Sequence, residues 1–522
     1  MNAPRGIRGL PGSREFGDDS TRESRIMKPR NCLIAAVVFH LHMAGCASAA
    51  TYFVSPAGRD ANKGTSVSSP WASLSKVNRT HFQPGDFIRF KAGARWAGEL
   101  WPKGSGTAGE PITLGSYGSG AKPVIDAQGV DGTAAIKLEN QEYWTIENME
   151  VANWAAHYGT RWGIYIGASD GRIKHGLKVL NDTVRDVCAS PIRSPAADAG
   201  YPTFYKVGGI FIDIPAPGRA DGVLIEGNYV TRIIGEGIAF FGQWESKGVM
   251  NYSNCSPHVV VRNNTVNRTA GDGILILGTD DELVEHNLVE YAGTMGVPGT
   301  DLIAGMWPTR HVNGLWQFNV VHHTARWKGD GEGLDNDCFV KGVTIFQDNY
   351  SHDNAGGFFL DCFVPDGGQS IVRYNISEND GMLGDLCRDN ALYYNNVFYA
   401  PGRIVSAKIE GSAKRGNMFY NNIFWCAGMK GFENQAFSHN AYYGGTAPMG
   451  GDGRAINSDP QFVNAAGAKG VEGFQLLANS PCLGKGSVIE NNGGLDLWGN
   501  PVSTTQPPNV GAYGGPGVGV GK

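Results

Sequence analysis

Acidic residues are concentrated between residues 326 and 390, and their spacing suggests acid–base chemistry. The tetrapeptide DCFV at 337–340 recurs as DCFV at 361–364, a translation of 24 residues, and another Asp follows 24 residues further on. If the fold repeats with this period, Asp337, Asp361 and Asp385 occupy matching positions on three successive repeats. Three more acidic residues share the segment: Asp330, Glu332 and Asp335.

A row of carboxylates one strand apart needs compensation. Adjacent parallel strands are separated by about 4.8 Å, at which two ionised carboxylates repel by roughly 3 kcal/mol with an effective dielectric near 20. A bound cation, a basic side chain or a proton held by a raised pKa would relieve that repulsion. Each of these remedies is also a functional device, whereas Asp residues that only cap turns remain the structural alternative.

Two catalytic chemistries fit this acidic segment. Glycoside hydrolysis needs two carboxyl groups beside the scissile bond, and Asp337 with Asp361 or Asp335 would supply them, with Glu332 as a further candidate. A lyase would instead bind Ca²⁺ through Asp residues and remove a proton with a basic side chain. In that case Asp337, Asp361 and Asp385 are the metal ligands. The nearest bases are Arg388 and Lys341, and neither lies in a recognisable lyase motif, which favours the hydrolase.

Aromatic residues near the acidic segment could hold a sugar ring. Trp307, Trp316 and Trp327 lie close to it in sequence, and Asp385 could also contact substrate. Flat aromatic faces suit sugar rings, but they serve equally well to anchor loops. No other cofactor is indicated, because the chain has no Cys-x-x-Cys motif and its His residues show no metal-binding spacing.

A second repeat predicts the elements that position these residues. Segments such as VLIEGNYV, VVVRNNTV and ELVEHNLV place one Asn between two β-prone stretches, with a period of 20 to 36 residues. Such repeats indicate a solenoid, in which Asn amides can bond from coil to coil. The Asn positions are Asn228, Asn264, Asn287, Asn319, Asn349, Asn375, Asn396 and Asn422.

The direction of the acidic side chains follows from alternation along each strand. GEG at 331–333 matches GEG at 235–237 and GDG at 271–273. Aligning them turns Leu334 inward and therefore Asp335 and Asp337 outward. A register slip of one residue would reverse both directions.

The whole pattern predicts an all-β chain, a single-stranded right-handed parallel β-helix with a short N-terminal capping helix. Residues 69–80 are predicted helical, with Ser69 as cap and Pro70 in the first turn. We expect the cap and first coils at 51–130, the β-helix core at 131–445, and closing coils at 446–522. The intervening segments are too rich in Gly, Asn and Asp for a βαβ fold.

The two ends of the solenoid carry specific sequence features. TYFVSPAGRDANKGTSVSSPWASLSKVN and PGDFIRFKAG at the start, and SDPQF, FQLLANSPCLGKG and NVGAYG at the end, resemble those of secreted bacterial β-helix proteins of the pectate-lyase-like superfamily. The resemblance covers nearly all of residues 51–514. It implies the fold and carbohydrate substrates, but no particular catalytic residue.

The remaining features concern location and partners. Residues 27–50 combine basic residues, an apolar stretch and a small-residue cleavage site, as a signal peptide does; residues 1–26 would then be an upstream extension or a mis-assigned start. We expect a secreted or periplasmic protein, with a lipoprotein anchored at Cys46 as the alternative. A net charge of -5 disfavours nucleic acid, and no segment is a clear membrane span. A monomer acting on polysaccharide is expected, with a non-catalytic glycan-binding protein as the alternative.

Overall fold

The computed structural model describes most of the chain beyond residue 48. The described residues are 49–189, 206–243, 250–297, 300, 302–327, 329–362, 367–380, 382–385, 391–408, 416–433, 435–445, 451–466 and 470–519. The chain divides into two units, Met1–Ala47 and Ser48–Lys522. Only the second unit falls within the described residues.

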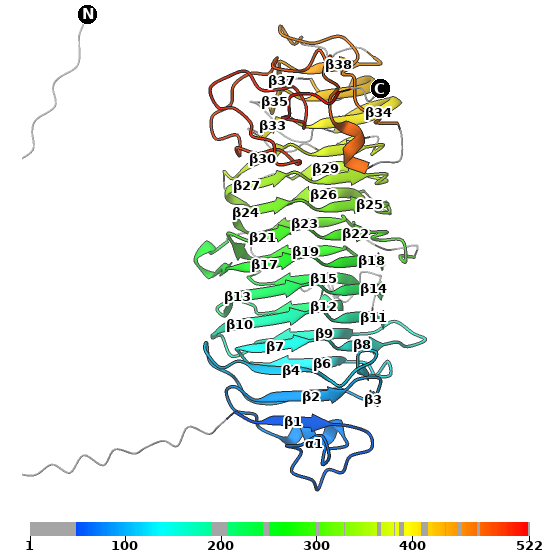
Figure 1. Cartoon of the computed structure of the whole chain (residues 1–522), viewed down its shortest axis with the longest axis vertical. Helices are drawn as coiled ribbons and strands as arrows, with labels where there is room; N and C mark the ends of the chain where they lie inside the picture. Colours follow the sequence, from blue (N-terminus) through cyan, green and yellow to red (C-terminus); the bar gives the residue numbers. More distant parts are fainter. Residues whose placement is uncertain are drawn as a thin grey trace, which may run out of the picture. The chain divides into compact units, whose positions relative to one another are not determined.

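The second unit is a parallel β-helix, in which three sheets wind around one core (Figure 1). Every strand of these sheets pairs in parallel with the corresponding strand of the next coil. This confirms the solenoid predicted from the Asn repeat and the fold implied by the sequence resemblance.

The longest sheet supplies the first strand of each coil and has 16 strands. Its strands are β1 (Thr51–Val54), β2 (Phe87–Lys91), β4 (Ile112–Tyr117), β7 (Trp144–Glu147), β10 (Ile173–Leu180), β13 (Arg219–Glu226), β16 (Ser256–Pro257), β17 (Val259–Arg262), β20 (Thr279–Asp280), β21 (Leu283–Glu285), β24 (Val312–Gln317), β27 (Lys341–Gln347), β30 (Gln369–Arg373), β33 (Leu392–Tyr394), β35 (Met418–Tyr420) and β37 (Ala436–Ser438).

A 14-stranded sheet supplies the second strand of each coil. Its strands are β3 (Arg95–Ala97), β5 (Val124–Asp126), β8 (Glu150–Asn153), β11 (Thr183–Cys188), β14 (Tyr229–Ile234), β18 (Thr265–Thr269), β22 (Leu288–Glu290), β25 (Val320–His322), β28 (Tyr350–His352), β31 (Ile376–Glu378), β32 (Met382–Asp385), β34 (Val397–Lys408), β36 (Ile423–Lys430) and β38 (Ala441–Tyr443).

An eight-stranded sheet closes the middle coils. Its strands are β6 (Thr133–Glu139), β9 (Arg161–Gly167), β12 (Gly208–Asp213), β15 (Glu236–Phe241), β19 (Ile274–Leu277), β23 (Met306–Thr309), β26 (Glu332–Asn336) and β29 (Gly357–Asp361). This sheet carries the acidic segment.

The Asn repeat forms a continuous ladder inside the solenoid. Asn319 Nδ2 donates to Asn349 Oδ1 at 3.0 Å and to the Val284 carbonyl at 2.9 Å, while its own Oδ1 accepts from the N–H and Nδ2 of Asn287. The pattern repeats along the coils, and all eight predicted Asn residues take part. Because every amide is buried and paired, the ladder fixes the stacking of neighbouring coils.

The predicted helix is shorter than its pattern suggested. Helix α1 (Leu74–Arg79) begins after Ser73, whose side chain accepts the N–H of Lys76. Ser69 and Pro70 precede it in irregular chain, because Trp71 forms a bridge with Val54 instead of a helical turn. Leu74 and Val77 are buried, and α1 lies beside β1 at the end of the coil stack (Figure 1).

Outside the coils, the described residues include the short 3₁₀ helices η3 (Tyr252–Asn254) and η4 (Gly470–Phe474). The C-terminal segment packs Phe474, Leu476 and Val510 against β34 and β36 residues such as Val397 and Ile423. This second apolar cluster anchors the closing segment to the last coils.

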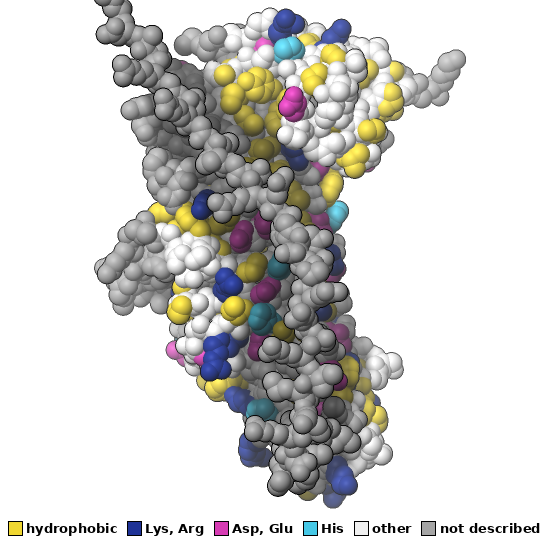
Figure 2. All heavy atoms as spheres, turned by 90° about the vertical axis from the view of Figure 1, so that its left-hand side faces the viewer, with side chains coloured by type: hydrophobic (Ala, Val, Ile, Leu, Met, Phe, Trp, Pro, Cys, Tyr) yellow, Lys and Arg dark blue, Asp and Glu magenta, His cyan; other side chains and the backbone are white. Residues whose placement is uncertain are grey.

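One face of the molecule carries side chains of both charge signs. Figure 2 shows basic, acidic and His side chains interspersed along the face that lies on the left of Figure 1. Among the described residues, no helix has both the length and the apolar character that crossing a membrane requires.

Candidate functional site

Strand β26 places the acidic segment on the outer face of the eight-stranded sheet. Leu334 lies in the core, and Asn336 donates its Nδ2 inward to Ser370 Oγ at 2.8 Å. Asp335 therefore points outward, as alternation predicted. The Asp337 N–H donates to the Pro308 carbonyl at 3.1 Å, which continues the pairing one residue past β26 and turns Asp337 outward as well.

Asp335 is an outward-facing carboxyl that is nevertheless closed off from solvent. Its exposure is 4%, and its register partner on β29 is Leu360. Burial, and then the negative charges of Asp337, Asp330 and Glu332, raise the pKa of Asp335 well above its usual range. Among the described residues, its Oδ1 has no hydrogen-bond partner. The raised pKa favours the protonated form of Asp335, and its buried Oδ1 is a hydrogen-bonding position that the described residues leave unused.

Asp337 is the more accessible neighbour of Asp335. It lies beside two thiols, and ligand atoms of Asp337, Cys338 and Cys362 are all within 4.8 Å of one another. The two sulfurs are 2.7 Å apart. The contact with Cys338, followed by burial and the charge of Asp337, raises the pKa of Cys362. The raised pKa favours the thiol form of Cys362.

A second set of carboxyls lies at the turn that leads into the eight-stranded sheet. Asp272 donates its backbone N–H to Glu236 Oε2 at 2.7 Å and accepts the Ala304 N–H on Oδ1 at 2.7 Å. Burial, and then the charge of Asp272, raise the pKa of Glu236 well above its usual range. Burial raises the pKa of Asp272 to about 7. Two buried carboxyls this close hold a proton between them.

The turn and the strand form one electrostatic unit. Asp330 lies between them in sequence, is half-buried, and its negative charge raises the pKa of both Asp272 and Asp335. The indole of Trp307 stabilises the ionised Asp272 by a hydrogen bond, and Trp307 lies on β23 next to β26. Asp330 is thus a charged neighbour that the two carboxyls share.

The GEG and GDG turns served to align the repeats in the sequence, but the carboxyls of Glu236 and Asp272 were not predicted as site residues. Glu236 and Asp272 are the acidic members of those turns, and both are buried. The signal was present, because an acidic residue recurring between two glycines at one buried position is unexpected for a solvated turn.

The predicted row of Asp337, Asp361 and Asp385 does not form. Asp361 pairs in register with Asn336, so the coil repeat here is 25 residues and the DCFV repeat is one residue out of step. Asp361 consequently points inward, is fully buried, and accepts from Ser370 Oγ at 2.8 Å. The Ca²⁺ row of the lyase interpretation loses its central ligand, because the buried alternation of Leu334 and Phe359, not the identity of the tetrapeptide, sets the register.

The three tryptophans near the acidic segment have different surroundings. Trp316 is fully buried in the core and donates to Glu282 Oε1 at 3.2 Å, so its assignment to substrate binding is wrong. Trp327 is 37% exposed and donates to the Gly293 carbonyl at 2.9 Å. Trp307 packs on the outer face of the eight-stranded sheet, in register with Leu275.

Other predicted residues are placed only in part. Arg388 lies outside the described residues. Asp385 ends β32, but its side chain is also outside them. Lys341 is exposed, with its Nζ 5.5 Å from the centre of the Tyr252 ring.

An apolar surface extends from Asp335 along the outer face of the sheet. Register places Phe211, Ala239 and Leu275 in one outward row on successive strands, and Trp307 continues the row. The cluster consists of Phe211, Ala239, Phe241, Leu275 and Leu277, with Trp162, Tyr165 and Trp307 packed against it. The five cluster residues are buried, whereas Trp162, Tyr165 and Trp307 are half-buried and are the members that a sugar ring could contact.

The groove formed on the 14-stranded sheet has different chemistry. It measures about 550 Å³ and is lined by Trp154 and three arginines, among other residues. Each arginine is paired with a carboxylate: Arg95 with Asp126, Arg185 with Glu150 and Asp186, and Arg232 with Asp186. In this groove Arg232 and Arg185 lower the pKa of Asp186, whereas the pKa of Asp335 is raised.

Comparison with known proteins places the chain near glycoside hydrolases. It is 25% identical over 591 aligned residues to a lacto-N-biosidase of Bifidobacterium longum, covering 89% of this chain and 36% of that protein. The chain thus spans about a third of that relative's length. The crystal structure of a GH136 lacto-N-biosidase from Eubacterium ramulus matches with a TM-score of 0.61 and 24% identity over 74% of this chain and 67% of the other.

A more distant solved structure shares the fold. XylC, solved with xylose, matches with a TM-score of 0.54 and 13% identity over 89% of this chain and 98% of that protein. No protein-family model matches the chain. These matches agree with the parallel β-helix and with carbohydrate-active relatives.

Proposed function

We propose that this protein is a glycoside hydrolase that cleaves a glycan lying along the outer face of the eight-stranded sheet. Asp335 acts as the general acid, and Asp337 acts as the base or nucleophile. The observation that carries the proposal is the outward-facing carboxyl of Asp335, whose pKa is raised, beside a second, more accessible carboxyl.

Asp335 has the properties of a proton donor to the glycosidic oxygen. A general acid must be protonated at the working pH, and burial with neighbouring negative charges shifts Asp335 in that direction by raising its pKa. Its Oδ1 is buried and has no hydrogen-bond partner among the described residues, and we assign it as the atom that donates the proton to the glycosidic oxygen. Proton transfer then lets the leaving sugar depart as an alcohol.

Asp337 is placed to assist from the same strand face. Residues two apart on a strand are separated by about 6.6 Å, the scale at which two catalytic carboxyls flank a glycosidic bond. Its ionised form either attacks the anomeric carbon or removes a proton from the attacking water. The pairing on which the proposal depends is therefore Asp335 with Asp337, not Asp337 with Asp361.

The similarity to two lacto-N-biosidases supports a hydrolase and suggests a glycan that ends in lacto-N-biose as the first substrate to test. The matches cover 89% and 74% of this chain. Half-buried Trp307, on the outer face of the same sheet, supports stacking of a sugar near Asp335.

The test is hydrolysis of an aryl lacto-N-bioside and of neutral and uronate polysaccharides, followed by reducing ends and by ultraviolet absorbance near 235 nm. We expect reducing ends without absorbance. General acid catalysis contributes about 10²–10⁴-fold, so Asp335→Asn should reduce kcat by that factor on an alkyl glycoside. A substrate with a nitrophenol leaving group needs less protonation and should show a smaller loss.

Matched variants separate chemistry from folding. Asp281→Asn changes an exposed Asp at a left-handed turn, φ 56°, where Asn is tolerated, and should retain full activity. Asp337→Asn should lose activity like Asp335→Asn, and nuclear magnetic resonance of the first-formed anomer distinguishes a nucleophile from a base. Full activity in Asp335→Asn, or an absorbance rise with uronate substrates, would contradict the proposal.

We also propose that the protein is exported, which the basic, apolar and small-residue pattern of residues 27–50 supports. Amino-terminal sequencing of protein recovered outside the cytoplasm should begin near Thr51. Recovery of intact chain only from the cytoplasm would contradict export.

A further inference from the structure

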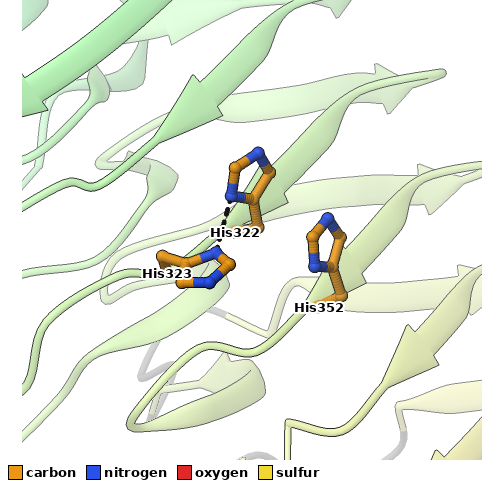
Figure 3. Close-up of side chains that lie close together, drawn as sticks. All are labelled: His322, His323 and His352. Carbon is orange, nitrogen blue, oxygen red and sulfur yellow. Dashed lines mark hydrogen bonds between the residues drawn. The ribbon is translucent and has the colours of Figure 1, made fainter. Parts of the chain in front are cut away.

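Three histidines converge on the outer face of the 14-stranded sheet, away from the acidic strand. His322 ends β25 and His352 ends β28, and the two are register partners on neighbouring coils. His323 follows in the turn after β25, with a left-handed φ of 58°. Figure 3 shows the three rings grouped together, with His323 turned toward His322.

The geometry of the rings differs from simple stacking. His322 and His352 stack with centroids 4.4 Å apart and an interplanar angle of 20°. His323 is nearly perpendicular to both, at 81° and 87°. One nitrogen from each ring lies within 4.8 Å of the other two, and the Nδ1 atoms of His322 and His323 are 2.8 Å apart.

Carboxylates beside two of the imidazoles hold their rings in place. Asp353 Oδ2 lies 2.9 Å from His352 Nδ1, and Glu290 Oε2 lies 3.5 Å from His322 Nε2. Carboxylates beside ligating histidines commonly fix ring orientation.

Aromatic side chains form the remaining walls. Tyr350 lies 4.8 Å from His352, and Tyr291 lies 4.9 Å from His323, both measured between ring centroids. The guanidinium of Arg268 lies over Tyr291 at 5.7 Å. His322 and His352 are thus held on two sides, with side-chain exposures of 14% and 20%, while His323 remains exposed.

We propose that His322, His323 and His352 bind one divalent late first-row transition metal ion, with Zn²⁺ as the probe ion, across two neighbouring coils. Imidazole favours zinc, copper and nickel over calcium or magnesium. Zinc–nitrogen bonds of about 2.0–2.1 Å in a tetrahedral site bring ligand nitrogens to roughly 3.3 Å, a small closure from the observed spacing. The fourth position faces outward and is open to water. This site is independent of the proposed glycosidase.

Sequence spacing hides this site. His322 and His323 are adjacent, and His352 follows 30 residues after His322, which matches no zinc motif. Because one coil of the solenoid takes up these 30 residues, His322 and His352 lie on adjacent strands.

The test is zinc binding by untagged, chelator-treated protein, measured in competition with a chromophoric chelator at pH 7.5. We expect one Zn²⁺ per chain in the wild type and at least tenfold weaker binding in His323→Asn and in His352→Gln. Asn is tolerated at the left-handed conformation of residue 323, and circular dichroism checks that both variants keep the fold.

Two controls make the result specific. His286→Asn alters another His at a left-handed position, φ 54°, and should bind zinc like the wild type. A Cys338→Ser, Cys362→Ser double variant tests the other cluster, Asp337 with the two thiols, and should also bind normally. Cu²⁺ bound to the wild type should show electron-paramagnetic-resonance coupling to imidazole nitrogens that is lost in His323→Asn.

Three outcomes would overturn the proposal. They are absence of zinc binding to the wild type at 10-fold excess over micromolar protein, unchanged binding in both His variants, and loss of binding in the double Cys variant. If the His variants fail to fold, Cu²⁺ spectra of the wild type decide, because a site without several imidazole nitrogens contradicts the assignment.

Discussion

Two rows of polar side chains run along the same coils, and repetition from coil to coil has opposite effects in them: amides pair, whereas carboxylates repel. The Asn ladder is made of neutral amides, each of which donates to the next coil and accepts from the previous one. The acidic turns hold Glu236, Asp272 and Glu332, all buried, in positions where a repeated carboxylate repels its neighbour. The ladder can extend through any number of coils, whereas stacked carboxylates repel one another unless some of them are protonated.

The difference separates a structural repeat from a functional one. Amide donors and acceptors are equal in number, so burial leaves none unpaired and the ladder stabilises the stack. Carboxylates offer only acceptors when ionised, and burial penalises their charge. A protein that keeps several such groups beside an outward-facing strand retains them at a cost in stability, as acid–base chemistry requires.

A raised pKa alone does not identify a functional carboxyl. Burial also raises the pKa of Asp380 to about 7, yet its oxygens accept hydrogen bonds from Asn354, Ser351 and Ser377. Asp335 differs because it faces outward and has an oxygen without a partner among the described residues. Direction and unused hydrogen-bonding capacity distinguish the two.

The largest expected effect comes from breaking the ladder. Asn319→Ala would leave the Val284 carbonyl and two donors of Asn287 without the Asn319 side chain, while Asn349 Oδ1 would keep the backbone N–H of Asn319 but lose its Nδ2. Each buried unsatisfied group costs about 1–3 kcal/mol, and partial relaxation limits the total to roughly 3–5 kcal/mol. Urea unfolding followed by circular dichroism measures it. Asn313→Ala, a half-buried Asn outside the ladder, serves as the comparison. Equal midpoints for the two variants would show that the ladder contributes little.

Replacing Asp272 in the acidic turns should change how the stability depends on pH. Asp272 has a folded-state pKa of about 7, above the usual Asp value of 3.8, so the folded protein binds an extra proton between these values. Its contribution to stability is present below about pH 4 and is lost as the pH rises through 7, with a slope of up to about 1.4 kcal/mol per pH unit. Asp272→Asn removes that slope and keeps an oxygen to accept the Ala304 N–H.

Unfolding free energies from pH 4 to 8 measure this effect as the difference between wild type and variant. Taking the difference cancels Asp182, Asp348 and Asp380, whose pKa values burial also raises. A difference that does not change with pH would mean that Asp272 is ionised throughout, against the proton-sharing interpretation.

The two tryptophans extend the comparison to aromatic residues. Trp316 is buried among core residues and stacks on Phe346 at 5.8 Å, so Trp316→Phe should cost about 1–3 kcal/mol of stability with little change in KM. Trp307 lies on the outer face, so Trp307→Phe should raise KM several-fold and change stability less. Steady-state kinetics and thermal unfolding of both variants test this. Identical behaviour would remove the distinction between core and substrate face.

The ladder and the inner faces were predictable because each depends on a local pattern that recurs many times. The same regularity could have assigned Trp316, since it lies three residues before ladder Asn319, the offset at which Val284 and Phe346 face the core. Asp361 was misplaced because an identical tetrapeptide suggested a 24-residue repeat, whereas packing of Leu334 against Phe359 imposes 25. Turn lengths decide such offsets, and no single-residue preference encodes them.

The apolar surface outside the eight-stranded sheet was not predicted for a related reason. Alternation was used to assign one buried face to each strand, but Phe211 and Phe241 lie on the opposite face from Ile210 and Phe240, and all four are buried. A strand that is apolar on both faces gives no alternating signal. Predicting this cluster therefore required the register between coils, which determines which outward-facing residues contact one another.

The smallest expected effect is a change in the pKa of Asp335, the proposed general acid. Glu332 adds to the negative charge that raises the pKa of Asp335, so Glu332→Gln should lower that pKa and shift the alkaline limb of kcat/KM against pH downward, by roughly one unit or less. The proton is lost from the acid at lower pH because its ionised form is repelled by one charge fewer. The maximal rate should change little. Asp281→Asn, far from the strand in sequence and exposed, should leave the limb in place. A limb that stays fixed in Glu332→Gln would mean that another group is the general acid, and that the buried carboxyls of this sheet act, like the Asn ladder, only on structure.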